Sequence, residues 1–191
     1  MKDTQIEELY GGKMSNKVDY KEEAKWWAKA GAFALGATIF INGAVVVNAK
    51  VPSSSMENTL VPGDRFFANR LAYKTENPKR FDVIVFKYPD DESKLFIKRI
   101  IGLPGEKVEV VDGKVYIDGS DFPLEESYIK EPMEGSFGPY EVPEDCYFVM
   151  GDNRNNSNDS RMWENSSVHR DKIVGKGLII YWPPSHAGTI D

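Results

Sequence analysis

The longest uncharged stretch of the chain, residues 30–49, restricts the fold more than any other feature. It contains no acidic or basic side chain (AGAFALGATIFINGAVVVNA). As a helix it would be about 30 Å long, roughly the thickness of the hydrocarbon core of a membrane. We therefore predict a transmembrane helix over residues 30–49. A buried core helix is one alternative, because glycines and asparagines dilute the segment. A cleaved signal peptide is another, since Val47–Ala49 resembles a cleavage site, but the polar region before the segment is too long for it.

The basic residues around this segment predict its orientation. Only Lys50 and Arg65 lie within about 20 residues after it. Lysines are frequent over the same distance before it (Lys13, Lys17, Lys21, Lys25 and Lys29). An excess of basic residues on one side favours the cytoplasm for that side. We expect a cytoplasmic polar tail over residues 1–29, the transmembrane helix over residues 30–49, and an extracytoplasmic β-rich domain over residues 50–191.

The composition excludes several classes of protein. Hydrophobic residues make up 41% and charged residues 28% of the chain, which is ordinary for a globular domain. The net charge of −6 argues against a general nucleic-acid-binding protein, which would carry a basic surplus. A single cysteine, Cys146, cannot form an internal disulfide, and no His/Cys spacing indicates a metal or cofactor site. We expect no cofactor and no metal.

Strand signals dominate the region after the apolar segment. The segments rich in β-branched and aromatic residues are 81–88, 95–101, 108–117, 146–150 and 178–182. Within 108–117, Asp112-Gly113 predicts a hairpin turn. Residues 118–145 contain several prolines and little periodicity, which indicates a long irregular excursion. We expect a mainly β fold: an antiparallel β-domain or partly open barrel.

Three consecutive serines, Ser53 to Ser55, follow the apolar segment closely. The extended chain from Ala49 to Ser55 reaches about 20 Å. If the segment spans a membrane, a reactive Ser55 therefore works near the membrane surface.

A serine nucleophile needs a base, and the chain offers two histidines and its lysines. His169 and His186 lie in polar or terminal segments without an evident partner, and no serine stands in a GxSxG motif. A Ser/Lys dyad remains. Lys98 shares one face of its predicted strand with Phe96 and Ile100. If that face is buried, the pKa of the lysine falls and the amine can act as a base; an exposed face or an edge strand is the alternative.

A third cluster, residues 151–161 (GDNRNNSNDSR), packs carboxylates, hydroxyls and two arginines into one short segment. It is either a polar surface loop or a network that positions another group.

These stretches together resemble the successive conserved motifs of bacterial type I signal (leader) peptidases, which use a Ser/Lys dyad. The similarity covers roughly residues 51–161, in the order found in that family, and rests on residues 52–60 (PSSSMENTL), 63–64 (GD), 80–86 (RFDVIVF), 98–106 (KRIIGLPGE) and 151–161.

The resemblance implies a role for each matching residue. Ser55 would be the nucleophile and Lys98 the general base. Ser53 would help to form the oxyanion hole, and Ser157 would hydrogen-bond the lysine. Asp152, Asp159 and Arg161 would support the site. The implied substrates are secretory preproteins whose signal peptides lie in the membrane, and the implied location is the bacterial cell membrane, crossed once. The lipid bilayer is then a partner and nucleic acid is not.

The chain departs from the family pattern at Ser54, Asn58 and Asn155, where glycine, proline and aspartate are usual. None of these residues carries a chemical role. Two other functions stay open at this point: a Ser/Lys peptidase with one dedicated substrate, and an anchored, non-catalytic β-domain that binds secretory precursors.

Overall fold

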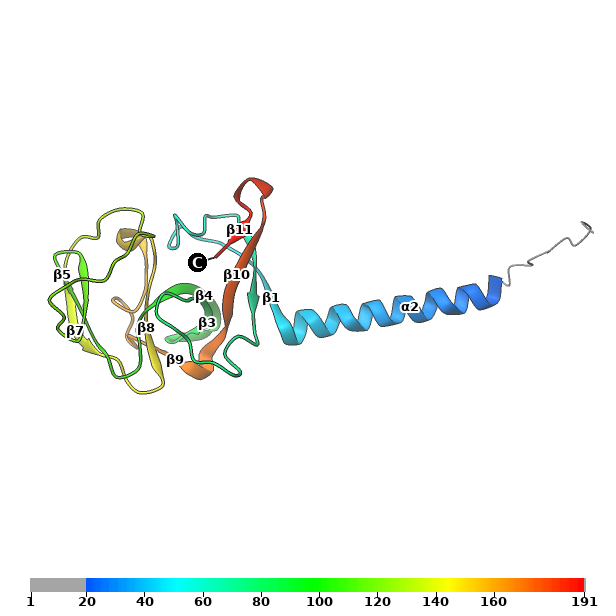
Figure 1. Ribbon diagram of the computed structural model, residues 1–191, viewed down its shortest axis with the longest axis horizontal. Coiled ribbons are helices and arrows are strands. Elements are labelled where there is room, and N and C mark those ends of the chain that lie inside the picture. The colour runs from blue at the N-terminus through cyan, green and yellow to red at the C-terminus, as the bar shows by residue number, and fades with distance from the viewer. Residues whose placement is uncertain (1–19, 191) are drawn as a thin grey trace, which may run out of the picture. The chain divides into compact units, whose positions relative to one another are not determined.

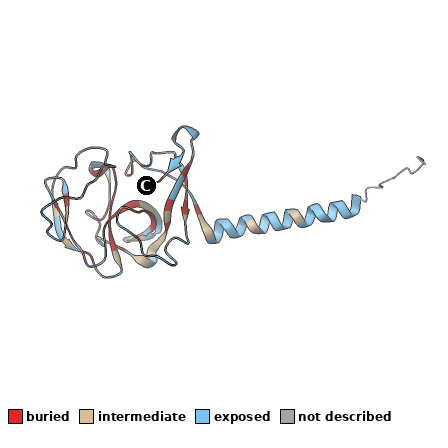
Figure 2. Cartoon of the chain, viewed as in Figure 1, coloured by how far each residue is buried: buried red, intermediate tan, exposed pale blue. Residues whose placement is uncertain are grey.

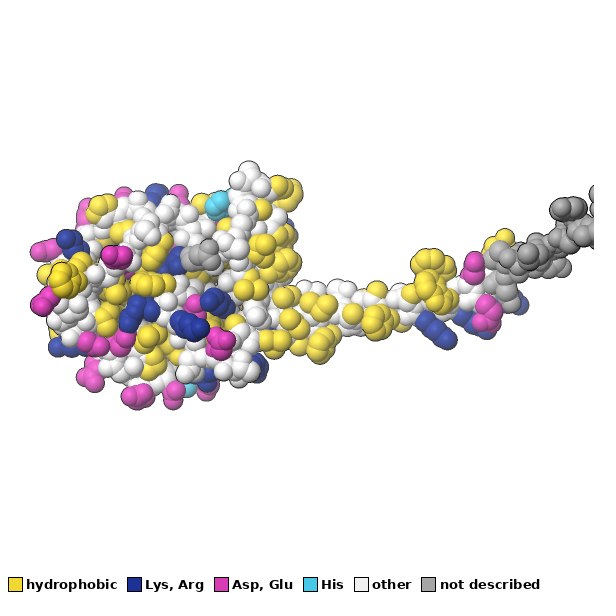
Figure 3. Space-filling view, in the orientation of Figure 1, with side chains coloured by type: hydrophobic (Ala, Val, Ile, Leu, Met, Phe, Trp, Pro, Cys, Tyr) yellow, Lys and Arg dark blue, Asp and Glu magenta, His cyan; other side chains and the backbone are white. Residues whose placement is uncertain are grey.

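The computed structural model describes residues 20–190, in two compact units divided between Ile39 and Phe40. Helix α2 (Tyr20–Phe40) forms the described part of the first unit up to Ile39. The π-helical turn η1 (Ile41–Val45), which continues the helix, belongs to the second unit. None of the residues of α2 is buried, and Figure 2 shows the helix exposed along most of its length. The charged side chains of α2 lie in its first turns, and hydrophobic side chains continue along the rest of the helix (Figure 3). By length and composition, Tyr20–Val45 is long and apolar enough to cross a membrane.

The observed helix differs from the predicted one at both ends. It already includes Tyr20, within the expected polar tail, and it ends at Val45 rather than at residue 49. Val46 to Lys50 form strand β1 instead, paired with β2. The β-branched Val46 and Val47 favour a strand, and Val47 is buried in the core of the second unit. Residues 1–19 of the predicted tail lie outside the described part of the chain.

The second unit contains two antiparallel sheets (Figure 1). In the larger sheet the strand order is β1-β2-β10-β3-β4-β8-β9, with β11 also paired to β10; in the smaller it is β6-β5-β7. The strands are β1 (Val46–Lys50), β2 (Arg65–Asn69), β3 (Val83–Tyr88), β4 (Asp91–Gly102), β5 (Lys107–Val111), β6 (Lys114–Ile117), β7 (Phe137–Glu141), β8 (Cys146–Met150), β9 (Val168–His169), β10 (Ile173–Trp182) and β11 (Gly188–Thr189). Three short 3-10 turns complete the unit: η2 (Arg154–Asn156), η3 (Arg170–Lys172) and η4 (Pro184–His186).

The expected antiparallel β architecture is confirmed. Each of the five predicted strand segments overlaps an observed strand, and β5 and β6 pair around Asp112 and Gly113, both with positive φ. Among the described residues the sheets do not close into a barrel, because the path of the larger sheet ends at β1 and at β9. The irregular excursion at 118–145 contains strand β7, which pairs with β5.

Three hydrophobic clusters form the core, and one of them joins the two sheets. In that cluster Ile101 and Phe148 from the larger sheet pack with Val108 and Val110 from the smaller one. The chain passes from β4 to β5 at this junction, through Gly102. A methyl group on Gly102 would lie 2.5 Å from a methyl carbon of Val108 and 3.0 Å from the Cβ of Phe148.

We therefore predict that Gly102→Ala destabilises the second unit. Overpacking a tight core costs about 1–3 kcal/mol, because neighbouring side chains must leave their preferred positions. Gly188→Ala is the matched control, since no atom lies within 4 Å of the position its Cβ would take. Urea unfolding in detergent measures both variants. Equal stability of Gly102→Ala and Gly188→Ala would contradict the packing described here.

Candidate active site

Ser55 lies in the loop between β1 and β2, and buried apolar side chains hold that loop. Met56 and Leu60 are buried in the core cluster under β1 and β2. Backbone hydrogen bonds from Val51 to the Asp64 oxygen (2.8 Å) and from Gly63 to the Val51 oxygen (2.9 Å) close its base. The hydroxyl of Ser55 is thus presented by a loop whose own apolar residues fix its position.

Strand β4 brings Lys98 to Ser55 across 43 positions of sequence. The two atoms Lys98 Nζ and Ser55 Oγ lie 2.7 Å apart, and Nζ also lies 3.0 Å from the Ile97 oxygen. Lys98 is only 4% exposed, because β4 is buried on both faces from residue 98 to residue 102. Burial lowers the pKa of Lys98 from 10.5 to about 8, although the negative charges of Asp159 and Asp152 act in the opposite direction.

Asp152 does not bind the lysine; it binds an arginine. The guanidinium of Arg99 donates from Nε to Oδ1 (2.9 Å) and from Nη2 to Oδ2 (2.8 Å) of Asp152, and both side chains are buried. Thr59 donates its hydroxyl to the same carboxylate and so links the serine loop to this pair. The guanidinium of Arg99 also stacks on the ring of Tyr128, 4.0 Å from its centroid.

Asp159 is held in the same way by Arg161. Its carboxylate accepts from Arg161 Nε (2.8 Å) and from the backbone N–H of Gly151 (3.0 Å). Arg161 also donates to the Arg154 oxygen at 2.7 Å, which ties the last residue of the 151–161 segment to an earlier turn of it. Both carboxylates near Lys98 therefore have arginine partners.

The 151–161 segment also holds the serine loop directly. The backbone N–H of Asn153 donates to the Ser55 oxygen (3.1 Å), and its side-chain amide donates to the Ser54 oxygen (3.1 Å). Asn156 donates to the Ser54 hydroxyl at 2.9 Å. The segment is thus the positioning network that was one of its two interpretations.

The two other predicted serines lie close to the dyad. The Ser53 hydroxyl is exposed and lies 3.5 Å from that of Ser55. The Ser157 hydroxyl is buried against Gly151, and it has no hydrogen-bond partner within the described residues. The bond from Ser157 to Lys98 that the resemblance implied is not formed in this structure.

The three departures from the family pattern each have a local explanation. Asn58 has a φ of 102°, a conformation closed to proline, and its side-chain amide donates to the Tyr128 oxygen at 2.9 Å. Asn155 accepts from the Glu134 N–H and donates to the Pro132 oxygen, and an aspartate could not make the second bond. Ser54 is bonded to Asn156, as described above.

A cavity of about 370 Å³ opens beside the dyad. Ser53, Ser54 and Ser55 line one part of it, and Leu95 to Lys98 of β4 line another. Asn156 and Asn158 complete the lining together with Pro52. An extended peptide could therefore reach the Ser55 hydroxyl between the serine loop and β4.

Sequence reasoning missed Arg99, Thr59 and Asn153. Arg99 carried a signal, because it alternates with apolar residues in β4 just as Lys98 does, so a buried partner was needed for it. Neither histidine contacts the dyad through a hydrogen bond in the described part of the chain. His186 lies 2.8 Å from the buried Asp64, and His169 lies beside Asp171.

A serine hydroxyl within hydrogen-bond distance of a buried, easily deprotonated lysine is the arrangement of a Ser/Lys hydrolase. Comparison with known proteins identifies the family. Residues 24–182 match the family model described as "Signal peptidase, peptidase S26". The chain belongs to this family, and it is accordingly a serine endopeptidase of the signal peptidase I type, a group that removes signal peptides from preproteins.

Curated relatives agree with this assignment. The chain is 40% identical over 173 residues to a probable signal peptidase I-2 of Synechocystis, a match that covers 86% of the chain and 77% of the relative. It is 43% identical over 148 residues to a signal peptidase I of Leptolyngbya laminosa, covering 73% and 70%. It is 34% identical over 181 residues to signal peptidase I P of Bacillus subtilis subsp. natto, covering 90% and 92%.

We predict that Arg99→Met destabilises the second unit strongly, because it leaves the Asp152 carboxylate buried and without its arginine. Breaking a buried ion pair from one side costs about 3–5 kcal/mol. Lys94→Met is the control on the same strand. Lys94 pairs with Asp91, but its side chain is 62% exposed, and such pairs contribute at most about 1 kcal/mol. Urea unfolding in detergent compares the two. A smaller loss for Arg99→Met than for Lys94→Met would show that Arg99 does not hold the network.

Proposed function

We propose that Ser55 is the nucleophile and Lys98 the general base with which this endopeptidase cuts signal peptides from preproteins. The 2.7 Å distance between Lys98 Nζ and Ser55 Oγ is the observation that carries the proposal. A base must lie within hydrogen-bond reach of the proton it removes, and this pair meets that condition before any substrate is bound.

The reaction follows from the two groups. The neutral amine of Lys98 takes the proton of the Ser55 hydroxyl as the oxygen attacks the scissile carbonyl carbon. The resulting ammonium then gives the proton to the departing amine, and an acyl-enzyme remains. In the second half of the reaction Lys98 activates a water molecule, which releases the signal peptide and restores Ser55.

The oxyanion of the tetrahedral intermediate needs hydrogen-bond donors. The backbone N–H of Ser55 and the hydroxyl of Ser53 are our candidates, because Ser53 lies 3.5 Å from the attacking oxygen. Removing one such donor costs about 3 kcal/mol in related enzymes. Asp152, Asp159 and Arg161 are assigned as supporting residues that do not touch the substrate.

Ser157 is assigned to the lysine side of the site. Its buried hydroxyl has no protein partner within the described residues, and we assign it to the amine of Lys98. This assignment rests on the family motif.

The membrane arrangement is also part of the proposal. Helix α2 with η1 would cross the bacterial membrane once, with the N-terminus in the cytoplasm and the peptidase domain on the outer face. The apolar composition of the helix supports the crossing, and the lysines before it and in its first turns support the orientation. Membrane-embedded preproteins would then reach Ser55, which follows closely on the end of η1 at Val45.

The two other candidate functions make different predictions. A dedicated Ser/Lys peptidase would cut one substrate, and a non-catalytic binding domain would cut none. Family membership favours general processing, and a panel of unrelated preproteins in a cleavage assay separates the three.

We predict that Ser55→Ala and Lys98→Arg each abolish preprotein cleavage in detergent. Alanine removes the nucleophile, and arginine keeps the charge but does not deprotonate. Ser53→Ala should retain the dyad and lose about 100-fold in kcat through the oxyanion. An active Lys98→Arg enzyme would remove the lysine from the mechanism. Full activity of Ser55→Ala would move the nucleophile to another residue.

The pH dependence of cleavage should report the state of Lys98. Because the amine must be neutral and its pKa is lowered to about 8, kcat/KM should rise with pH up to about 8 and then level off. Below that point the rate should fall about tenfold per pH unit. A preprotein whose own groups do not titrate between about pH 6 and 10 gives the clearest profile. A rate that continues to rise to about pH 10 would mean that the lysine keeps its ordinary pKa.

A further inference from the structure

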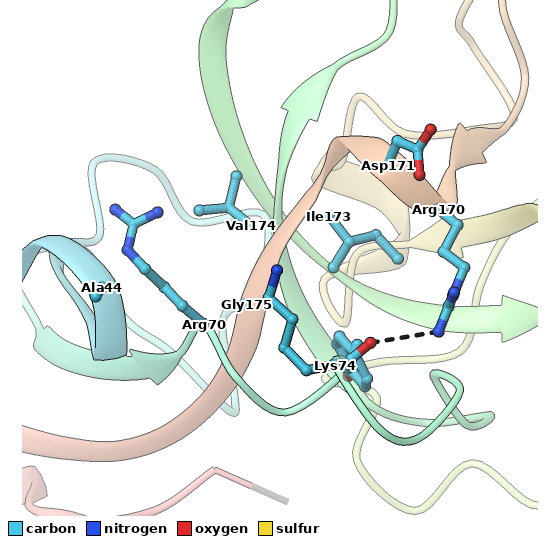
Figure 4. Close-up of a pocket in the computed structure, with 9 residues that line it drawn as sticks. Ala44, Arg70, Lys74, Arg170, Asp171, Ile173, Val174 and Gly175 are labelled. Atoms are coloured by element: carbon cyan, nitrogen blue, oxygen red, sulfur yellow. Dashed lines mark hydrogen bonds between the residues drawn. The ribbon is translucent and has the colours of Figure 1, made fainter.

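A second cavity, of about 600 Å³, lies in the same unit and shares no lining residue with the one beside Ser55. Its walls come from three regions: Ala44 of η1, the turn after β2, and the chain from η3 into β10 (Figure 4). The lining residues are Ala44, Arg70, Tyr73, Lys74, Arg170, Asp171, Ile173, Val174 and Gly175. Nothing in the peptidase mechanism uses it.

Cations dominate the charge of this cavity, although the whole chain is acidic. Arg70, Lys74 and Arg170 line it, and Asp171 is the one carboxylate among the lining residues. The Asp171 side chain is 83% exposed, and its ion-pair partner is His169, at 3.7 Å, and not one of the three cations. None of the ion pairs among the described residues includes Lys74, so its charge is available to a ligand.

The cations are held by the fold. Arg170 donates from Nη2 to the oxygens of Tyr73 (3.3 Å) and Glu76 (3.2 Å), and so fixes the turn that carries Lys74. The dashed line in Figure 4 marks the bond to Tyr73. The Nε of Arg170 is buried and has no protein partner among the described residues.

Arg70 is fixed on the opposite wall. Its Nε lies 3.4 Å from the Val46 oxygen, a long contact that leaves most of its five N–H donors for another group. A Cβ at Gly175 would lie 2.7 Å from the Asn69 oxygen, so glycine lets β10 lie close to the backbone that carries the Arg70 side chain. In Figure 4 the side chains of Arg70 and Lys74 extend on either side of Val174 and Gly175.

The position of the cavity along the chain indicates where its ligand comes from. Ala44 belongs to η1, shortly beyond Phe40, where α2 ends. At about 1.5 Å per residue, Ala44 lies only about 6 Å beyond Phe40 along the axis of the segment that we propose as the membrane anchor. Lipid headgroups lie at this depth, and the apolar Ile173 and Val174 line the same cavity.

We propose that this cavity binds the phosphate group of an anionic phospholipid. Arg70 would contact the phosphate oxygens with two parallel N–H donors, and Lys74 would supply a second positive charge. Ala44, Ile173 and Val174 would contact the glycerol backbone or the start of the acyl chains. The inference rests on the proposed membrane anchoring, and it is independent of the roles of Ser55 and Lys98.

The test uses the full-length chain in a non-ionic detergent, with bound lipid counted by native mass spectrometry. Phosphatidylglycerol, phosphatidylcholine and glycerol 3-phosphate are the three probes. R70Q/K74Q removes the two cations, and R65Q/K87Q is the matched control, because both of its residues are exposed, outside the cavity, and it changes the net charge equally.

We expect the wild type and R65Q/K87Q to bind phosphatidylglycerol at least about tenfold more tightly than phosphatidylcholine. R70Q/K74Q should raise the Kd for phosphatidylglycerol about tenfold and leave that for phosphatidylcholine unchanged. Arg70→Lys, which keeps the charge and removes the paired donors, should show an intermediate loss, and it tests the proposal even if the double variant does not fold.

Equal affinity for the two lipids, or an equal loss in R65Q/K87Q, would overturn the proposal. Competition by glycerol 3-phosphate as strong as that by the lipid would identify a soluble phosphate ligand and overturn the lipid assignment. Preprotein cleavage by the same samples keeps the two proposals apart. If the lipid preference fails while cleavage persists, only the lipid site is lost, and if the wild type binds lipid but does not cleave, only the peptidase proposal fails.

Discussion

A buried lysine that must stay free of carboxylate partners is the constraint on which the rest of this site depends. An opposite charge within about 4–6 Å can raise the pKa of a lysine and keep it protonated, which would make it useless as a base. Two buried carboxylates, Asp152 and Asp159, nevertheless act on Lys98. Each is bound by its own arginine, Arg99 or Arg161, and not by the lysine. Burial therefore dominates, and the pKa falls.

The same arginine pairs connect the site to the fold. Arg99 is the neighbour of Lys98 on β4, and its side chain projects from the other face of the strand. There it meets Asp152, Thr59 of the serine loop, and the ring of Tyr128. One strand thus places the base on one face and the support of the nucleophile loop on the other. A change in the register of β4 by one residue would move Lys98 and Arg99 to the opposite faces. The base would then leave Ser55, and the nucleophile loop would lose its arginine support.

The sequence predicted the local features of this molecule well and the long-range ones poorly. The strands with alternating or β-branched patterns were found, because their signal lies within a few residues. Strand β1 was missed, since its valines continue the apolar run and only pairing with β2 makes them a strand. The Ser55 and Lys98 assignment came from motifs, whereas their distance came from the fold. No local pattern could show that Arg99 meets Asp152, 53 positions away, or that Ser157 packs against Gly151 without a hydrogen bond to the lysine.

The short passage from η1 into β1 has a consequence for how the peptidase unit can be separated from its helix. β1 begins at Val46, immediately after η1, and stands at the edge of the larger sheet. A fragment that started at Lys50, where the apolar run ends, would lose this strand and leave the hydrogen-bonding edge of β2 open to other chains. It would also remove Val47 from the core that seats the serine loop. The smallest self-contained peptidase therefore begins inside the apolar segment. Removing the residues of β1 would make a fragment less apolar, whereas keeping them is necessary for a complete sheet and core.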